Sequence, residues 1–363
     1  MENQENIVKY EEASAFISPA FCGLLIIYIY IIIIIIIMIV GCRVFVISFI
    51  YFEPLFFLQE YIVNSRGIKV FTCRWSPAND QPKALIFLCH GYGMECSVSM
   101  RGCATRLVKA GYEVHGMDCE GHGKSPGLLG LVSDFDNLID DLSEHFTNIC
   151  EMRENRKKMR ILMGESMGGA MALRLHRKKP DYWDGAVLVA PMCKIADDMK
   201  PSPVVVKILV SLSRIIPTWK LTPTPDIIDI AFRDPKVRKE VRTNRYTYKG
   251  RPRLQTSYQL YKASLDLEKR LEEVSLPFLV LHGEDDKVTD PSVSKVLYES
   301  ARATDKKLKL YPGMWHSLSY GELPENLDTV FSDIVEWLDK RYSARCFELE
   351  DQLKHANDKV ICT

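Results

Sequence analysis

Short apolar runs, separated by turns and by stretches with helical character, make up most of the chain. Four of them, residues 84–89, 161–163, 277–281 and 308–311, pass directly into turns that contain glycine or proline. Short continuous apolar runs are typical of strands buried on both faces, as in a parallel sheet. Their alternation with helical stretches predicts an α/β fold with a mostly parallel central sheet and helices on both faces.

The alternation is interrupted at about residues 193–273. This segment is helical in character and rich in apolar residues, notably at 204–210 and 215–219. We interpret it as a helical cap on a main domain that spans residues 60–342. An apolar cap suits an acyl chain, although the same side chains could simply pack onto the main domain.

One turn carries the strongest chemical signal in the chain. Residues 164–168 read Gly-Glu-Ser-Met-Gly, directly after an apolar run and directly before a helical stretch. A G-x-S-x-G sequence between a strand and a helix predicts a nucleophile elbow, a tight turn that lifts the Ser166 hydroxyl clear of the sheet. The alternative is a glycine-rich turn with an incidental serine.

A serine nucleophile needs a base and a carboxylate that orients the base. The turn after the run 277–281 offers Glu284, Asp285 and Asp286, and the turn after the next run offers His316. The chain order serine, acid, histidine is that of α/β-hydrolases. These residues leave Asp285 and Asp286 equivalent as the orienting acid, and His316 could instead be a structural core histidine.

Asp290 has another assignment. It directly precedes Pro291 at the start of a helical stretch, which favours a helix N-cap.

An oxyanion hole requires two preorganised N–H donors. The backbone N–H of Met167, the residue after the nucleophile, supplies the first in such an elbow. The run 84–89 opens into His90-Gly91-Tyr92-Gly93, and we expect the Tyr92 N–H to be the second donor. His90 then braces the loop rather than transferring protons.

Together these motifs resemble the plant monoacylglycerol lipase and caffeoylshikimate esterase family of α/β-hydrolases, which is serine aminopeptidase S33-like. The resemblance covers about residues 61–342. It rests on the sequences at 90–95, 120–125, 164–169, 190–192, 282–286 and 311–317. The family pattern Gly-x-x-Asp-x-Val-x-x-Pro falls on Gly283, Asp286, Val288 and Pro291, so the resemblance implies Asp286 as the acid. It also implies Tyr92 and Met167 as the oxyanion donors.

The resemblance implies a serine ester hydrolase without metal or organic cofactor, acting on a small-molecule ester through an acyl-serine intermediate. A long-chain monoacylglycerol is the first expected substrate, and caffeoylshikimate or another hydroxycinnamoyl ester is the second. Lysophospholipase or acyltransferase activity is a third alternative. A non-catalytic binding protein of the same fold is the least favoured, because Ser166, Asp286 and His316 are all present. A His-x4-Asp sequence at His176 and Asp181, a spacing found in some acyltransferases, is interpreted as surface.

The composition bears on the partners and the cellular compartment expected for the protein. The 363-residue chain has a formal net charge of zero, which gives no reason to expect nucleic acid as a partner. Its 11 cysteines show no metal-binding spacing, which favours a reducing compartment and buried thiols. The segment 343–363 is polar, and we expect a fraying helix there.

The N-terminal extension, residues 1–59, is unusual. Residues 13–42 contain no charged side chain, and the hydrophobic stretch at about 21–52 is long enough to predict a transmembrane helix. The expected protein is membrane-associated with a cytosolic catalytic domain. A competing hypothesis is that residues 13–59 are a translated intron, because the related family joins the equivalents of Glu12 and Glu60 directly. Without the insert we expect a cytoplasmic protein.

Overall fold

The structure is a computed structural model that describes residues 46–47, 55–78, 81–195, 200, 202–222 and 224–361. Contacts group Ile47–Thr363 as one unit. The hydrophobic stretch predicted at 21–52 lies outside the described residues, apart from the two-residue strand β1 (Val46–Ile47). Within the described ranges, no helix combines the length and the apolar character needed to cross a bilayer.

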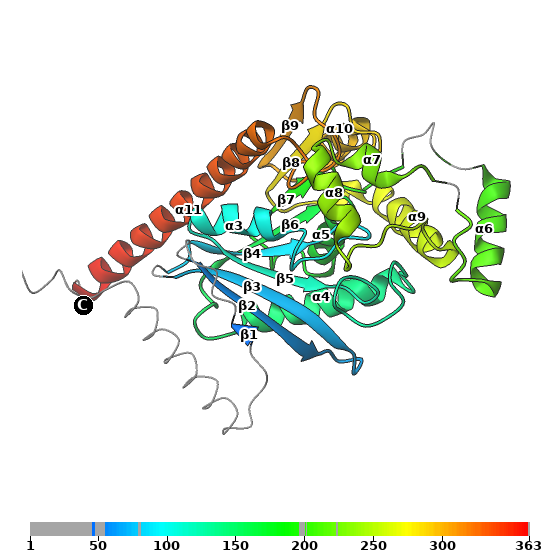
Figure 1. Ribbon diagram of the computed structural model, residues 1–363. Helices are drawn as coiled ribbons and strands as arrows, with labels where there is room; N and C mark the ends of the chain where they lie inside the picture. Colours follow the sequence, from blue (N-terminus) through cyan, green and yellow to red (C-terminus); the bar gives the residue numbers. More distant parts are fainter. Residues whose placement is uncertain are drawn as a thin grey trace, which may run out of the picture. The chain divides into compact units, whose positions relative to one another are not determined.

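A single sheet forms the centre of the fold (Figure 1). After β1 its strands are β2 (Leu55–Val63), β3 (Lys69–Pro77), β4 (Ala84–Cys89), β5 (Glu113–Asp118), β6 (Met159–Glu165), β7 (Gly185–Val189), β8 (Phe278–Gly283) and β9 (Lys306–Tyr311). Their order across the sheet is β1-β2-β3-β5-β4-β6-β7-β8-β9. β3 is antiparallel to β2 and β5, and the strands from β5 to β9 are parallel neighbours. The predicted mostly parallel sheet is confirmed.

Helices cover both faces of this sheet, as expected. On one face α3 (Arg101–Lys109) and α11 (Pro324–Ile361) pack against residues such as Ile86 of β4. On the other face α4 (Phe135–Cys150), α5 (Met167–Lys178) and α10 (Pro291–Ser300) pack against residues such as Phe87. Successive residues of β4 enter opposite cores because strand side chains alternate between faces. This explains why the apolar runs are continuous.

At both ends of the main domain, regular secondary structure extends past the boundaries expected from the sequence, in β2 and in α11. β2 begins at Leu55, ahead of the domain start expected at residue 60. Phe57 of β2 is buried and stacks on Trp75 of β3, with 5.0 Å between ring centroids. At the other end, α11 continues through the polar segment 343–361 as one helix.

The described part of the chain between β7 and β8 is largely helical. Its elements are α6 (Pro203–Ile215), α7 (Ile227–Ala231), α8 (Pro235–Thr243), α9 (Leu254–Glu268) and the short 3-10 helix η3 (Leu271–Glu273). α9 contacts both α4 and α5 of the main domain, and α6 packs on α9. We refer to residues 193–273 as the cap.

Candidate active site

Ser166 lies between β6 and α5 in a strained backbone conformation. Its φ and ψ are 57° and −118°, a region that non-glycine residues rarely adopt. Two glycines make the turn possible: a Cβ on Gly164 would lie 2.1 Å from the Gly168 carbonyl oxygen, and one on Gly168 would lie 1.9 Å from the Cys89 oxygen. The Ser166 N–H donates to the Val189 carbonyl at 2.9 Å. Tight packing against β4 and β7 therefore holds the turn.

His316 and Asp286 meet at the same edge of the sheet, because they follow the parallel strands β9 and β8. His316 Nδ1 lies 2.7 Å from Asp286 Oδ2. Gly283 allows this approach, since a Cβ there would lie 2.4 Å from the carbonyl oxygens of both Met314 and Trp315. Both side chains of the pair are buried, whereas Asp285 is exposed. The structure brings Asp286, and not Asp285, to His316.

The Asp286 carboxylate has a full set of donors. Oδ1 accepts from the N–H groups of Val288 at 2.7 Å and Thr289 at 3.0 Å. Oδ2 accepts from Thr289 Oγ1 and from His282 Nε2, both at 3.0 Å. Burial alone would raise the pKa of Asp286, but the charge of His316 and the hydrogen bonds of both histidines outweigh burial and hold that pKa well below its usual value. Asp286 therefore stays ionised beside His316.

The pKa of His316 is shifted upward. Burial acts to lower it, but the charge and hydrogen bond of Asp286, with a further contribution from Glu165, raise it. Glu165 is the residue before the nucleophile, and its Oε2 accepts from the Ser319 N–H at 3.0 Å. Burial raises the pKa of Glu165, although His316 and Ser319 oppose the change. Sequence reasoning missed Glu165, and its place inside the G-x-S-x-G motif was the available signal.

Ser166 and His316 line one cavity of about 490 Å³ between the main domain and the cap. Tyr92 and Met167 line it too. A Cβ on Gly91 would lie 3.7 Å from Ser166 Cβ, which places the loop that carries Tyr92 beside the nucleophile. Among the described residues, the backbone N–H groups of Tyr92 and Met167 have no hydrogen-bond acceptor. This arrangement is what a developing oxyanion requires.

His90 is fully buried under that loop. Its Nε2 accepts from the Cys119 N–H at 3.1 Å, and its Nδ1 lies 2.9 Å from the Gly91 carbonyl oxygen. The ring thus ties the loop to the end of β5, in keeping with the bracing role expected for it.

The cap supplies the opposite wall of the cavity. Its apolar residues there are Ile227, Ile228, Ala231, Phe232, Val241 and Leu260. Two cationic residues, Lys249 and Arg251, also line it and are exposed. The site therefore combines an apolar wall with a basic rim.

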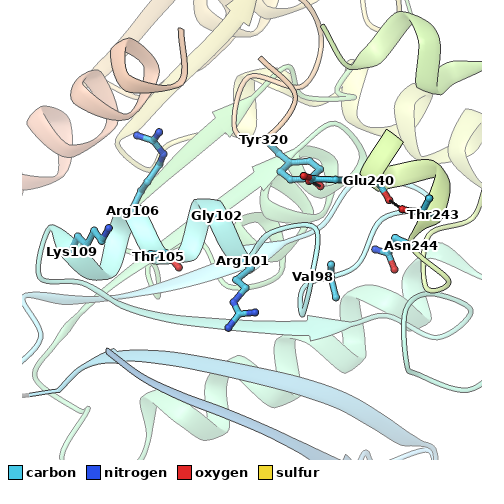
Figure 2. Close-up of a pocket in the computed structure, with 10 residues that line it drawn as sticks. All are labelled: Val98, Arg101, Gly102, Thr105, Arg106, Lys109, Glu240, Thr243, Asn244 and Tyr320. Carbon is cyan, nitrogen blue, oxygen red and sulfur yellow. Dashed lines mark hydrogen bonds between the residues drawn. The ribbon is translucent and has the colours of Figure 1, made fainter. Parts of the chain in front are cut away.

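A larger surface groove of about 830 Å³ lies elsewhere, between α3 and α8 (Figure 2). Neither Ser166 nor His316 lines it. Its basic residues Arg101, Arg106 and Lys109 point in different directions in Figure 2, and Arg106 pairs with Asp328 at 2.7 Å. Since these groups do not converge, the groove is not the candidate active site.

The interpretation of His176 as a surface residue is wrong. Its side chain is buried on α5, and its Nε2 accepts from the Ser275 N–H at 3.1 Å. The helix presents this side chain to the segment that leads into β8, so His176 fixes a connection in the core. Asp181, the other half of the spacing, is exposed. Neither residue lines the cavity at Ser166.

No group of His, Cys, Asp and Glu among the described residues could hold a metal ion. The chemistry that the site supports is nucleophilic attack by Ser166, which lines the same cavity as the His316 of a buried His–Asp pair.

The sheet and the elbow together define a serine hydrolase of the α/β-hydrolase fold. Residues 80–323 match the family model "Serine aminopeptidase, S33". The chain therefore belongs to this family and is a carboxylic ester hydrolase of the monoglyceride lipase and esterase group.

The relatives of this chain are named for two different substrates, a hydroxycinnamoyl ester and a monoacylglycerol. The chain is 32% identical to caffeoylshikimate esterase of Arabidopsis thaliana, over 78% of this chain and 85% of that protein. It is 31% identical to monoglyceride lipase of Homo sapiens, over 77% and 90% of the two chains. The crystal structure of Paleococcus ferrophilus monoacylglycerol lipase superposes with a TM-score of 0.63 at 25% identity, covering 75% of this chain and 99% of that one.

Proposed function

We propose that this enzyme cleaves a monoacylglycerol to glycerol and a free fatty acid through an acyl-Ser166 intermediate. The observation that carries the proposal is a single cavity containing both Ser166 and an Asp286-bound His316 under an apolar cap wall. The relatives named monoglyceride lipase support the same substrate.

In the proposed mechanism His316 takes the proton of Ser166 as the hydroxyl attacks the ester carbonyl. The N–H groups of Tyr92 and Met167 stabilise the tetrahedral oxyanion. His316 then gives the proton to the leaving glycerol oxygen and, in the second half, activates the water that releases the fatty acid. Asp286, ionised throughout, orients the imidazole and stabilises its charged form.

The cap offers a reason to favour a lipid. Beyond the apolar cavity wall, α6 exposes four large apolar side chains: Val204 is 66% exposed, Val205 52%, Ile208 53% and Ile215 76%. A concentrated exposed apolar surface marks an interaction site. An apolar helix surface suits contact with the lipid phase that holds a monoacylglycerol.

A second candidate, a hydroxycinnamoyl ester such as caffeoylshikimate, is favoured by a different feature. Lys249 and Arg251 line the cavity, and the acidic residue Asp226, which also lines it, pairs with Arg242 at 2.8 Å rather than with either of them. An acid on the alcohol part of the ester, such as the carboxylate of shikimate, would pair with these cations.

The test is turnover of both esters by the same preparation, with Ser166→Ala as the control. Faster release of glycerol supports the lipase, and faster release of caffeate supports the second candidate. Replacing Lys249 and Arg251 with Gln should slow only the ester with the acidic alcohol. Equal effects on both esters would remove the argument for that candidate, and full activity of Ser166→Ala would overturn the mechanism.

A further inference from the structure

A second histidine contacts the carboxylate that orients His316. His282, in β8, is fully buried, and its Nε2 lies 3.0 Å from Asp286 Oδ2. This is the same oxygen that His316 Nδ1 approaches at 2.7 Å. Two imidazoles thus share one carboxylate oxygen.

The surroundings of His282 fix its tautomer. Nε2 also lies 3.0 Å from the Thr289 carbonyl oxygen, so two acceptors face this nitrogen. It must therefore carry a hydrogen. Nδ1 lies 2.7 Å from the hydroxyl of Ser294, a fully buried residue of α10. The Ser294 hydroxyl can donate to Nδ1, so each ring nitrogen has a hydrogen-bond partner when the proton is on Nε2.

We propose that His282 is a positioning residue for catalysis, which holds Asp286 Oδ2 at the distance and angle that His316 requires. The proposal rests on the roles proposed above for Ser166, Asp286 and His316. The active site then extends as a buried hydrogen-bonded chain from His316 through Asp286 and His282 to Ser294.

The contacts of Oδ2 show why this donor matters. Besides the two histidines, Oδ2 has only one donor among the described residues, Thr289 Oγ1. That hydroxyl has a competing acceptor, the Ala190 carbonyl oxygen at 3.3 Å, and a hydroxyl has one proton to give. The Oδ1 side is held by two backbone N–H groups. Without His282 the carboxylate can therefore turn about its Oδ1 contacts, and Oδ2 moves relative to His316.

The experiment compares two substitutions that remove the same ring. His282→Gln keeps an N–H donor near the position of Nε2, whereas His282→Leu removes it at similar volume. The substrate is a chromogenic p-nitrophenyl ester, so that the result does not depend on the natural substrate. We expect His282→Leu to lose about 10- to 100-fold in kcat with KM nearly unchanged, the scale of a lost hydrogen bond to a charged group. His282→Gln should recover most of that loss.

Ser294→Ala gives a second test should His282→Leu not fold. It leaves the ring in place and removes the hydrogen-bond partner of Nδ1, which loosens the hold of the ring on Asp286, so kcat should fall about 3- to 10-fold. In every variant, the deshielded proton NMR signal of the His316 Nδ1–H should shift in parallel with kcat.

Controls separate this inference from the proposed function. Full activity of Asp286→Asn would refute the proposed triad itself. Loss of activity in Asp286→Asn, with unchanged kcat in His282→Leu, would leave the triad intact and overturn the role of His282. If His282→Leu does not fold, an unchanged kcat and proton signal in Ser294→Ala would overturn it. Equal losses in His282→Gln and His282→Leu would show that the ring matters only for packing.

Discussion

The elbow helix and the first cap helix face solvent very differently. In α5, nine of the residues from Met167 to His176 are buried, while in α6 only Ser213 is. The turn before α5 is fixed by contacts that admit no Cβ at Gly164 or Gly168. α6, by contrast, is a helix of apolar residues that mostly remain outside any core. The comparison shows that the helix after the nucleophile is built into the core of the main domain, whereas the first helix of the cap contributes almost nothing to a core.

The largest effect on activity should come from replacing Asp286, the acid of the main domain that contacts His316. Asp286→Asn should lower kcat/KM by about a thousand- to ten-thousand-fold, because the amide holds the wrong imidazole tautomer. Asp285→Asn is the matched control, since Asp285 is the neighbouring exposed acid. It should stay within about 2-fold of the parent rate. A reversed result would assign the orienting role to Asp285.

The close packing at the elbow predicts that two glycines of the main domain, Gly168 and Gly102, differ in how their replacement changes the free energy of unfolding. Gly168→Ala places a Cβ 1.9 Å from the Cys89 oxygen and should lower the free energy of unfolding by about 3 kcal/mol or more. A Cβ on Gly102 of α3 would meet nothing within 4 Å, so Gly102→Ala should stabilise the protein by about 0.5–1 kcal/mol. Urea unfolding of both variants measures the contrast. Equal stabilities would contradict the close packing of the elbow.

On the cap side, effects should depend on the substrate. The double variant Val204→Ser and Ile208→Ser should slow hydrolysis of vesicle-bound monoacylglycerol by about 3- to 10-fold, through lost apolar contact with lipid. Its rate with a soluble short-chain ester should not change. Phe347→Ser is the control, because Phe347 is also an exposed apolar residue, 72% exposed, but lies on α11. The same slowing in the control would remove α6 from the explanation.

The smallest expected effect is on the pH dependence of kcat/KM, and it comes from Glu165, which lines the cavity. The charge of Glu165 contributes to the raised pKa of His316, and the base must be neutral to accept the serine proton. Glu165→Gln should therefore lower the pKa of His316 and move the acidic limb of the kcat/KM profile to lower pH. Asp286 remains the larger influence, so the shift should be less than about one pH unit. A shift to higher pH would contradict this account.

Sequence patterns predicted the sheet and the placement of Ser166 and His316, because parallel strands bring their following turns to one edge. They did not separate Asp285 from Asp286, since a loop has no regular side-chain periodicity from which the inward-facing residue could be predicted. The resemblance to the family was needed for that choice. His282 escaped notice because it belongs to the strand before the catalytic loop. His176 was misplaced because a polar sequence around it concealed one inward-facing position.

The stack of Phe57 on Trp75 bears on the two explanations for the N-terminal extension. If Glu12 is joined directly to Glu60, Tyr10 takes the position of Phe57 in β2, and Lys9 takes that of the exposed Phe56. An aromatic ring would then still face Trp75, and a charge would face solvent. Either N-terminus would therefore supply the aromatic ring that packs on Trp75. We therefore expect the joined chain to keep the activity of the longer one, with Tyr10 protected from solvent as Phe57 is here.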